Sequence, residues 1–562
     1  MKKILFWMLI VCTAVIHGQS SSEALSERVY LQTDKQLYLA GELLYLKVFT
    51  VTTDKKPLSF SKIVYVELLD EANSRVQVKI ELTNGVGEGW MELPPSLPTG
   101  HYRLVAYTRF MRNESENVFL GKNIGVVNTF LSNQIKNNYT DVASLEPEIY
   151  APPTCSLHTD KSSYANREKG ILKLEGLPEN IHTLSVSIAG KAPVTVEGVN
   201  DIRQWEKQLP VASVQHSEKY LPEYEGHIIV GKIVPVQTQT NNEDKFIISL
   251  LSFPGEKLYL FGGRRDNMND VSFFTTNTAG VREVSTTAYN LTENTYRIDL
   301  QSPFIEQHAN KQLPELKVDS THFDELLQRS FALQALYSYT KDQLIQDRPV
   351  DFRLDMTPTK TYILDEWTRF VAMNELMIEF ISELRFRRND RQNNELFMAT
   401  RKGDEMVWIR PLVVLDGIPI MDHDIIYRYD PLLLERVNIY FGEYFFQGTR
   451  FEGIVEFLTY RRNYPGLSTD QSTQIVNYAG TQTPRRLYTP DYSREETRKS
   501  RLPDYRHTLL WEPALQTNGK STLEIPFFTS DYSGEFQATV EGLTLDGKII
   551  SATATFGVQR KQ

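Results

Sequence analysis

Residues Pro411–Tyr460 carry the most informative stretch of the chain, PLVVLDGIPIMDHDIIYRYDPLLLERVNIYFGEYFFQGTRFEGIVEFLTY. An apolar run leads into an Asp-Gly pair, and an Asp-Pro pair precedes a second apolar run. The turn residues of the stretch are Asp416-Gly417, Asp430-Pro431, Gly442, Gly448 and Gly453-Ile454. Apolar runs separated by such turn residues predict short strands.

This pattern resembles the core of the plug domain of TonB-dependent outer-membrane receptors. In that family a β-barrel of about two dozen strands follows the plug. A membrane strand needs about 9–11 residues, and the segment from Tyr460 to Gln562 is too short for a barrel of that size. We therefore expect a plug-like α/β domain over residues 359–462 without a pore, and no transport activity.

The resemblance places a candidate interaction region at the turns of this domain. The candidate residues are Asp416, Gly417, Asp422, His423, Asp430 and Arg436. Asp422-His423-Asp424 also offers ligands for a cation, although a turn between strands favours solvated side chains there. No catalytic residue, cofactor site or metal site follows from the resemblance.

A motif occurs twice in the first third of the chain. Thr33-Asp34-Lys35-Gln36-Leu37-Tyr38-Leu39-Ala40-Gly41-Glu42 and the segment Thr159–Glu168 share Thr, Asp, Lys, Tyr and Glu at the same spacing, and Lys47 and Lys173 fall in register. The first copy resembles the first strand and turn of a macroglobulin-type domain of the α-2-macroglobulin superfamily. The repeat therefore predicts two such β-sandwiches, over residues 19–130 and 150–220.

The predicted fold class is mainly β and multidomain, with tandem Ig-like, macroglobulin-type β-sandwiches plus one α/β plug-like domain. The remaining predicted parts are a carboxypeptidase-regulatory-like or macroglobulin-like sandwich (221–305), a helical connector (306–358), a polar linker (463–504) and a macroglobulin-like β unit (505–562). Apolar spacing predicts helices over Thr321–Gln346 and Glu366–Arg385. The β unit at the C-terminus either completes an earlier sandwich or stands alone.

Met1–Gly18 has two lysines, an apolar run and a small residue at its end, which predicts a secretory signal peptide. A lipoprotein signal at Cys12 is an alternative, but Val11 stands where such signals have a small residue. We expect an exported protein of the periplasm or the outer-membrane surface. No second apolar run of about 20 residues follows, so membrane association is expected through a partner rather than a transmembrane segment. The net charge of −10 argues against nucleic acid as a partner.

Few residues suggest catalysis. Cys155 is followed by Ser156-Leu157, so the Cys-Gly-Glu-Gln thioester of trapping macroglobulins is absent from this position. His322 and Glu325 have a spacing that zinc carboxypeptidases use, but a surface pair at a helix start is favoured. The arginines Arg385, Arg387, Arg388 and Arg391 suit the end of a helix, and contact with an acidic partner surface is the alternative.

The sequence therefore favours a non-enzymatic scaffold or accessory protein that binds an envelope partner through its plug-like and sandwich domains. An outer-membrane barrel complex is one such partner. The alternative is a periplasmic metal-dependent hydrolase with His322, Glu325, Asp422 and His423 as its candidates. We expect no cofactor.

Overall fold

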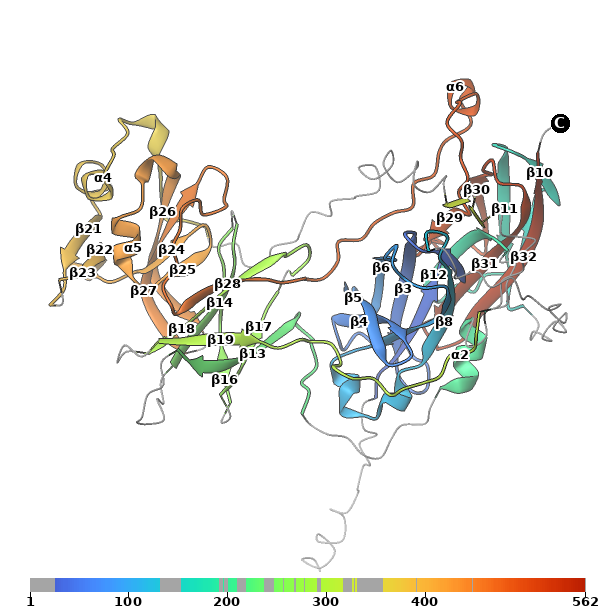
Figure 1. Cartoon of the computed structure of the whole chain (residues 1–562), viewed down its shortest axis with the longest axis horizontal. Coiled ribbons are helices and arrows are strands. Elements are labelled where there is room, and N and C mark those ends of the chain that lie inside the picture. The colour runs from blue at the N-terminus through green and yellow to red at the C-terminus, as the bar shows by residue number, and fades with distance from the viewer. Residues whose placement is uncertain are drawn as a thin grey trace, which may run out of the picture.

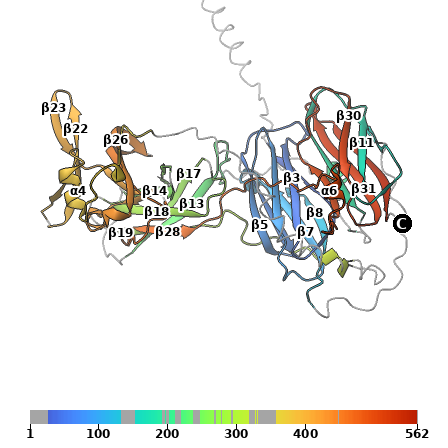
Figure 2. The same ribbon diagram turned by 90° about the horizontal axis from the view of Figure 1, so that it is seen from above.

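The protein is mainly β and multidomain, as the sequence predicts (Figure 1). The computed structural model describes residues 26–131, 153–191, 196, 201–209, 219–236, 247–255, 257–266, 269–276, 278–290, 295–316, 326–327, 329–330, 357–390, 392–446 and 448–560. The predicted leader lies outside these residues, and so does most of the predicted helix Thr321–Gln346. Two sandwiches form one end of the molecule, and a middle domain and a distal α/β unit form the other (Figures 1 and 2).

The first sandwich is formed by residues 26–131. Its smaller sheet has the order β1 (Arg28–Thr33), β3 (Leu43–Val51), β6 (Val86–Glu92), and its larger sheet has the order β2 (Leu37–Leu39), β8 (Gly121–Val127), β7 (Gly100–Tyr107), β4 (Ile63–Asp70), β5 (Asn73–Glu81). The short helices η1 (Phe110–Asn113) and η2 (Glu116–Val118) lie between β7 and β8. Apolar side chains from both sheets, such as Leu44, Val66 and Ile80, fill the core between them.

The second sandwich is assembled from two distant parts of the chain. Its smaller sheet has the order β30 (Thr522–Phe528), β11 (Lys169–Glu175), β9 (Ser156–Thr159), and its larger sheet has the order β10 (Ser163–Ala165), β32 (Ile549–Gln559), β31 (Gly534–Thr544), β12 (Ile181–Gly190), β29 (Thr508–Glu512). The strands of residues 505–562 therefore complete the sandwich that begins near residue 153. Of the two alternatives for the C-terminal β unit, it therefore completes an earlier sandwich and does not stand alone.

The two sandwiches have the same strand order. When β9–β12 and β29–β32 are matched in chain order with β1–β8, each sheet of one sandwich reproduces a sheet of the other. In this match β12 and β29 correspond to β4 and β5, which a short turn connects. Residues 191–507 take the place of that turn, yet β12 and β29 still pair as antiparallel neighbours, with Val186 opposite Glu512. The middle domain and the distal unit are thus an insertion in the second sandwich.

The repeated motif builds the same hydrogen-bond network in both sandwiches. The Tyr38 hydroxyl donates to Asp34 Oδ1 at 2.7 Å, and the Tyr164 hydroxyl donates to Asp160 Oδ1 at 2.6 Å. The motif lysine pairs with the motif glutamate in each copy, as Lys35 with Glu42 and Lys161 with Glu168. The same glutamate also accepts a backbone N–H, from Leu39 in one copy and Ala165 in the other. The residue types that the two copies share therefore give both sandwiches the same turn geometry.

An apolar and hydrogen-bonded interface joins the two sandwiches. Helix α2 (Ile202–Gln208) lies there, capped by Asp201, and the Trp205 ring contacts the rings of Tyr30 and Phe49. Leu543 from β31 completes this cluster. Lys47 is buried in the same interface, and burial lowers the pKa of its ammonium to about 7 despite nearby carboxylates. Lys173, its counterpart in the repeat, instead pairs with Glu524 in a more exposed position.

The middle domain is one strongly curved sheet. Its strand order is β15 (Tyr259–Gly262), β14 (Ile247–Phe253), β18 (Glu283–Asn290), β19 (Thr295–Leu300), β13 (Ile228–Pro235), β17 (Asp270–Phe274), β16 (Arg264–Arg265), with β28 (Thr473–Asn477) paired to β18. Strand β28 lies inside the segment 463–504, for which the sequence predicts a linker.

After β28 the chain crosses the first sandwich, where the Arg485 guanidinium lies 3.9 Å from the centre of the Trp90 ring. It then continues past the short helix α6 (Glu495–Arg498).

A buried polar cluster joins the first sandwich to the middle domain. The Tyr65 hydroxyl donates to Glu223 at 2.9 Å, and His227 Nδ1 lies 2.8 Å from Glu223 Oε1. The ring of His227 also contacts Lys79 and Tyr478. All five residues come from three separate chain segments, so this cluster orients the insertion relative to the sandwiches.

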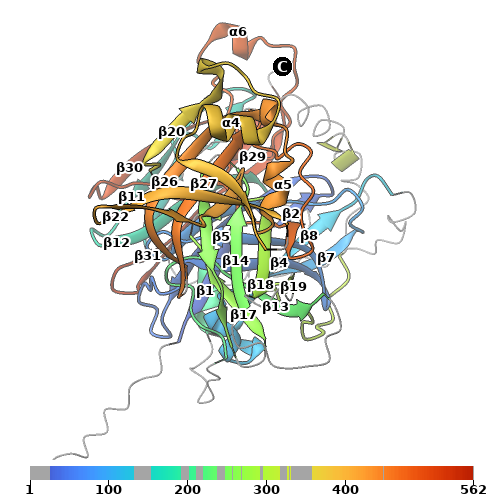
Figure 3. The same ribbon diagram turned by 90° about the vertical axis from the view of Figure 1, so that its left-hand side faces the viewer.

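The distal unit consists of residues 357–467 and has two sheets (Figure 3). The larger has the order β20 (Lys360–Ile363), β26 (Leu434–Phe446), β27 (Thr449–Thr459), β24 (Leu412–Leu415), β25 (Ile418–Ile420), and the smaller has the order β21 (Leu384–Arg388), β22 (Asn394–Lys402), β23 (Glu405–Ile409). Its helices are η5 (Leu364–Glu366), α4 (Met373–Glu379), α5 (His423–Tyr427) and η6 (Pro431–Leu433). The strands of its larger sheet pack on Leu250, Leu258 and Leu260 of the middle domain.

The helix predicted over Glu366–Arg385 is wrong. Helix α4 spans only Met373–Glu379, and Leu384 begins a strand that pairs with β22. Leu384 and Phe386 face the interior while Arg385 and Arg387 face solvent, which is the two-residue period of a strand. Arg385, Arg387 and Arg388 therefore lie on a strand and do not close a helix, whereas Arg391 lies outside the described residues. Pairing with β22 overrides the weak helical spacing of the preceding residues.

Candidate functional site

Asp416 and Gly417 form the tight turn between β24 and β25. Their φ angles are 47° and 85°, the left-handed pair of a type I′ hairpin. The Asp416 carboxylate is fully buried, and it accepts hydrogen bonds from the Thr459 and Tyr464 backbone N–H groups at 2.8 and 2.7 Å. The Asp416 carbonyl accepts one from Gly255 N–H in the middle domain at 2.9 Å. The structure corrects the prediction here, because both residues serve contacts within the chain.

His423 is also structural. Only 4% of the residue is exposed, and its Nδ1 accepts a hydrogen bond from the Leu396 backbone N–H at 3.0 Å. Burial lowers the pKa of His423 to about 3, so the ring is neutral at physiological pH. Asp422 caps helix α5, and Asp424 accepts two hydrogen bonds from Asn394. Within the described ranges, no group of three or more acidic, histidine or cysteine side chains is arranged to hold a metal ion.

Asp422 and Asp430 do come together, at a surface depression of about 570 Å³. Asp424 and Asp470 also line it, beside Arg428. Arg436 lies elsewhere, on β26 opposite Ile363 of β20. Of the six candidate residues, the structure therefore places two at one accessible and acidic surface.

A second accessible feature is a set of exposed apolar side chains from or beside α4 and the segments η5, η6, β20 and β27, and we call it the apolar patch. Its members are six apolar or aromatic side chains of the distal unit, each at least 43% exposed, namely Ile363, Trp367, Val371, Ile378, Leu432 and Tyr460. Met406 and Phe445 of the same unit are also exposed, but we do not count them in this patch. Val371 is 75% exposed and Trp367 is 60% exposed. Large apolar patches on a protein surface are typical of sites that bind a partner.

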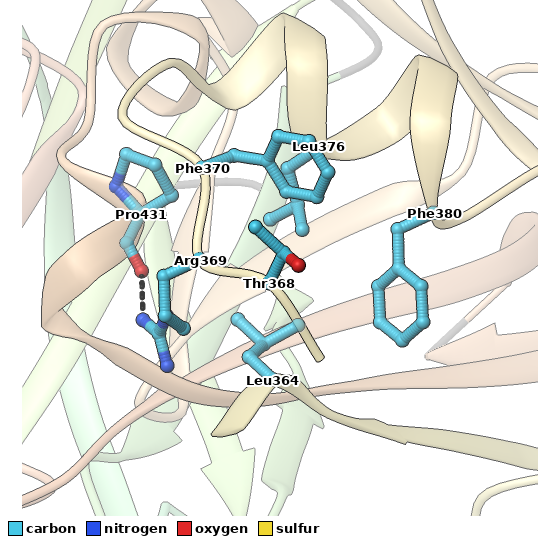
Figure 4. Close-up of a pocket in the computed structure, with 7 residues that line it drawn as sticks. All are labelled: Leu364, Thr368, Arg369, Phe370, Leu376, Phe380 and Pro431. Carbon is cyan, nitrogen blue, oxygen red and sulfur yellow. Dashed lines mark hydrogen bonds between the residues drawn. The ribbon is translucent and has the colours of Figure 1, made fainter. Parts of the chain in front are cut away.

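The apolar patch borders a shallow pocket, drawn in Figure 4. The pocket is lined by Leu364, Thr368, Arg369, Phe370, Leu376, Phe380 and Pro431. Each patch residue except Ile378 and Tyr460 is a direct sequence neighbour of a pocket residue. The Trp367 and Phe380 rings are in contact, with centroids 4.9 Å apart. Apolar side chains thus form both the rim and the floor of this surface.

Arg369 fixes the shape of the surface by joining three segments. Its guanidinium donates to the carbonyls of Pro431 and Leu434 at 2.6 and 2.9 Å, and the first of these bonds is visible in Figure 4. It also donates to Asp365 at 2.6 Å and to the Tyr460 hydroxyl at 2.9 Å. The hydrogen bond from Tyr460 lowers the pKa of the Asp365 carboxyl. Because one side chain holds η5, η6 and the end of β27, the patch is preorganised.

The spacing of Trp367, Val371 and Ile378 predicts that these side chains lie on the buried face of a long helix. Helix α4 is short, and its buried residues are Met373, Leu376 and Met377. The exposed side chains were therefore mistaken for core. The one available indication was Trp367, an aromatic residue that lies outside helix α4.

The other predicted chemical sites gain no support from the described residues. His322 and Glu325 lie outside them. Cys155 is buried, and burial raises the pKa of its thiol. Within the described part of the chain, no helix combines the length and the apolar composition that crossing a membrane requires.

Comparisons with known proteins give distant likenesses only. No family model matches the chain, and no curated protein matches it. Among solved structures, Escherichia coli α-2-macroglobulin activated by porcine elastase has 10% identity and a TM-score of 0.25, covering 95% of this chain and 44% of that one. Salmonella α-2-macroglobulin mutant Y1175G has 10% identity and a TM-score of 0.23, covering 95% and 39%. The Escherichia coli adhesin FdeC has 9% identity and a TM-score of 0.14, covering 53% and 66%.

The chain spans less than half the length of the two α-2-macroglobulins it matches. At TM-scores this low, the likenesses carry no argument about family or activity. What the structure itself establishes is a mainly β, multidomain protein with two sandwiches of identical strand order.

Proposed function

We propose that the protein is a non-enzymatic scaffold of the bacterial envelope that binds a protein partner through the apolar patch of the distal unit. The plug resemblance of residues 359–462 favours an outer-membrane barrel complex as that partner. The predicted leader Met1–Gly18 supports export to the periplasm or the outer-membrane surface. The two macroglobulin-like sandwiches would form the rigid base of the scaffold.

The observation that carries the proposal is the exposure of Trp367 and Val371 beside a pocket with apolar walls. Aromatic side chains that project from a preorganised surface are typical of the energetic centre of protein interfaces. Fully burying an exposed Val side chain contributes about 1.5–3 kcal/mol, and a Trp side chain offers a larger apolar area. The patch also lies in the part of the molecule that is farthest from the sandwiches (Figure 1).

Photo-crosslinking in living cells tests the proposal. A photoreactive phenylalanine analogue replaces Val371 in the full chain, and captured proteins are identified by mass spectrometry. We expect one envelope protein to be captured reproducibly from this position. The Trp367→Ser substitution in the same chain should abolish the capture, because it removes the largest apolar contact.

Leu545 provides the matched control position. It is apolar and 58% exposed, but it belongs to the second sandwich. Capture of the same protein with equal yield from both positions would contradict a specific surface, and so would capture of the chain alone from Val371. The hydrolase alternative is not proposed, since no observation on the described residues favours it.

A further inference from the structure

The outer face of the small sheet β21–β22–β23 concentrates arginine and aromatic side chains. We call it the arginine–tryptophan face, and its members are Arg385, Arg387, Phe397, Arg401, Met406 and Trp408. Leu384, Leu396 and Met398 point to the opposite, buried side. Strand pairing sets Arg385 opposite Phe397, Ala399 opposite Trp408 and Arg401 opposite Met406. Residues that are paired in this way share one side of a sheet.

Aromatic rings hold two of the guanidinium groups in place. The Arg387 guanidinium lies 4.8 Å from the centre of the Trp408 ring and 5.6 Å from that of Phe397. The Arg385 guanidinium lies 5.4 Å from the Trp408 ring. Stacking on a ring leaves the N–H groups at the edge of a guanidinium free to donate to a carboxylate.

Positive charge is in excess on this face, because its three arginines outnumber its one carboxylate, Glu395, which lies opposite Arg387 in the strand pairing. Arg385, Arg387 and Arg401 form no ion pair with any described carboxylate, although the protein has a net charge of −10. The Glu395 carboxylate accepts a hydrogen bond from the Asn389 amide at 3.2 Å. Ala399 is small and buried on this side of the sheet, opposite Trp408.

We infer that the arginine–tryptophan face binds an acidic polypeptide segment of a partner protein. Charge complementarity requires an anionic occupant. The composition then favours a protein, since Trp, Arg and Met are the residues enriched in the cores of protein interfaces. A guanidinium fork matches the two oxygens of an Asp or Glu side chain, and the rings supply area for the apolar part of the segment. The face is separate from the apolar patch, and it lies at the exposed end of the distal unit (Figure 2).

Binding of a fluorescein-labelled poly-glutamate peptide to the full chain, followed by fluorescence anisotropy, tests the inference. The Arg385→Gln and Arg387→Gln double variant should lower the association constant by about tenfold or more, because it removes charge-assisted hydrogen bonds. Arg387→Lys keeps the charge and should still lower it by about threefold, since the fork and the stacking are lost. Trp408→Leu should also lower the association constant for the peptide.

Arg461→Gln is the matched control, because Arg461 is an exposed arginine of the same unit outside this face. It should leave the association constant within about twofold of the original, as is usual for a single exposed charge. Equal binding by the double variant and the original chain would overturn the inference. So would arginine-dependent binding to phosphatidylglycerol vesicles without binding to the peptide, which would assign the face to a lipid surface.

Discussion

The Tyr30 hydroxyl donates a hydrogen bond to Glu541 Oε2 at 2.8 Å, although 511 positions separate the two residues in the chain. Both side chains are buried between the two sandwiches. The Ile202 backbone N–H donates to the other carboxylate oxygen at 3.2 Å. Burial raises the pKa of the Glu541 carboxyl, so the carboxylate depends on these donors and on Lys122 nearby. This bond ties β1 to β31, near the two ends of the described chain.

Tyr30→Phe should therefore destabilise the interface between the sandwiches. The variant leaves a buried carboxylate oxygen without its donor, which costs about 1.5–3 kcal/mol of unfolding free energy. Calorimetric unfolding of the full chain measures the change. Tyr224→Phe, at a residue that is 57% exposed, should change the free energy by no more than about 0.5 kcal/mol. Similar effects of the two variants would show that the Tyr30 bond contributes little.

The repeated motif allows a comparison of one substitution in two environments. Asp34 accepts hydrogen bonds from Tyr38, Tyr45 and Thr508, and only 2% of it is exposed. Asp160 accepts the equivalent bonds from Tyr164 and Ile171 at an exposed position. Asp34→Ala should cost about 3 kcal/mol or more of unfolding free energy, and Asp160→Ala about 1 kcal/mol. Calorimetric unfolding of both variants measures these two losses. Equal losses of unfolding free energy would contradict the idea that burial makes the Asp34 network more stabilising.

The Asp416-Gly417 turn should be intolerant of a side chain at Gly417. A Cβ atom there would lie 2.8 Å from the Phe253 carbonyl oxygen of the middle domain, at a φ of 85°. Gly417→Ala should weaken the contact between the two parts and speed hydrogen exchange at the Gly255 amide. Gly403→Ala is the control, because its φ of 65° is similar but no atom lies within 4 Å. It should cost only the backbone strain of about 1–2 kcal/mol and leave exchange at Gly255 unchanged.

His423 should make the distal unit sensitive to acid. Its pKa is about 3 in the folded chain and about 6.5 when unfolded. The unfolded state therefore binds more protons between these values, and the stability present above about pH 6.5 falls as the pH drops. The slope approaches about 1.4 kcal/mol per pH unit.

Hydrogen exchange at the Leu396 amide, which donates to the His423 ring, measures this loss between pH 7 and pH 5. His423→Asn keeps an acceptor near the same position and does not titrate, so its protection should vary little with pH once intrinsic exchange is subtracted. His158→Asn, at an exposed histidine, should behave like the original chain. A pH dependence that survives in His423→Asn would assign the effect to another group.

Local patterns in the sequence were sufficient for several features. The repeated Thr-Asp-Lys motif predicted two sandwiches that begin alike, since its side chains bond to backbone groups within a dozen residues. The alternation of apolar and polar residues predicted a mainly β fold. The Asp416-Gly417 pair predicted a turn, because few residue pairs adopt two left-handed conformations in succession.

The tertiary structure decided what depends on distant partners. Only the strand pairing across the insertion showed that β29–β32 complete the sandwich begun by β9–β12. The sequence of a β strand does not specify which neighbouring strand it pairs with. Only packing showed that Asp416 and His423 are buried while Trp367 and Val371 are exposed. The sequence by itself determined the kinds of elements and the local turns, because these rest on short-range sterics and hydrogen bonds. The order of strands and the exposed surfaces required the fold, because they rest on contacts between residues hundreds of positions apart.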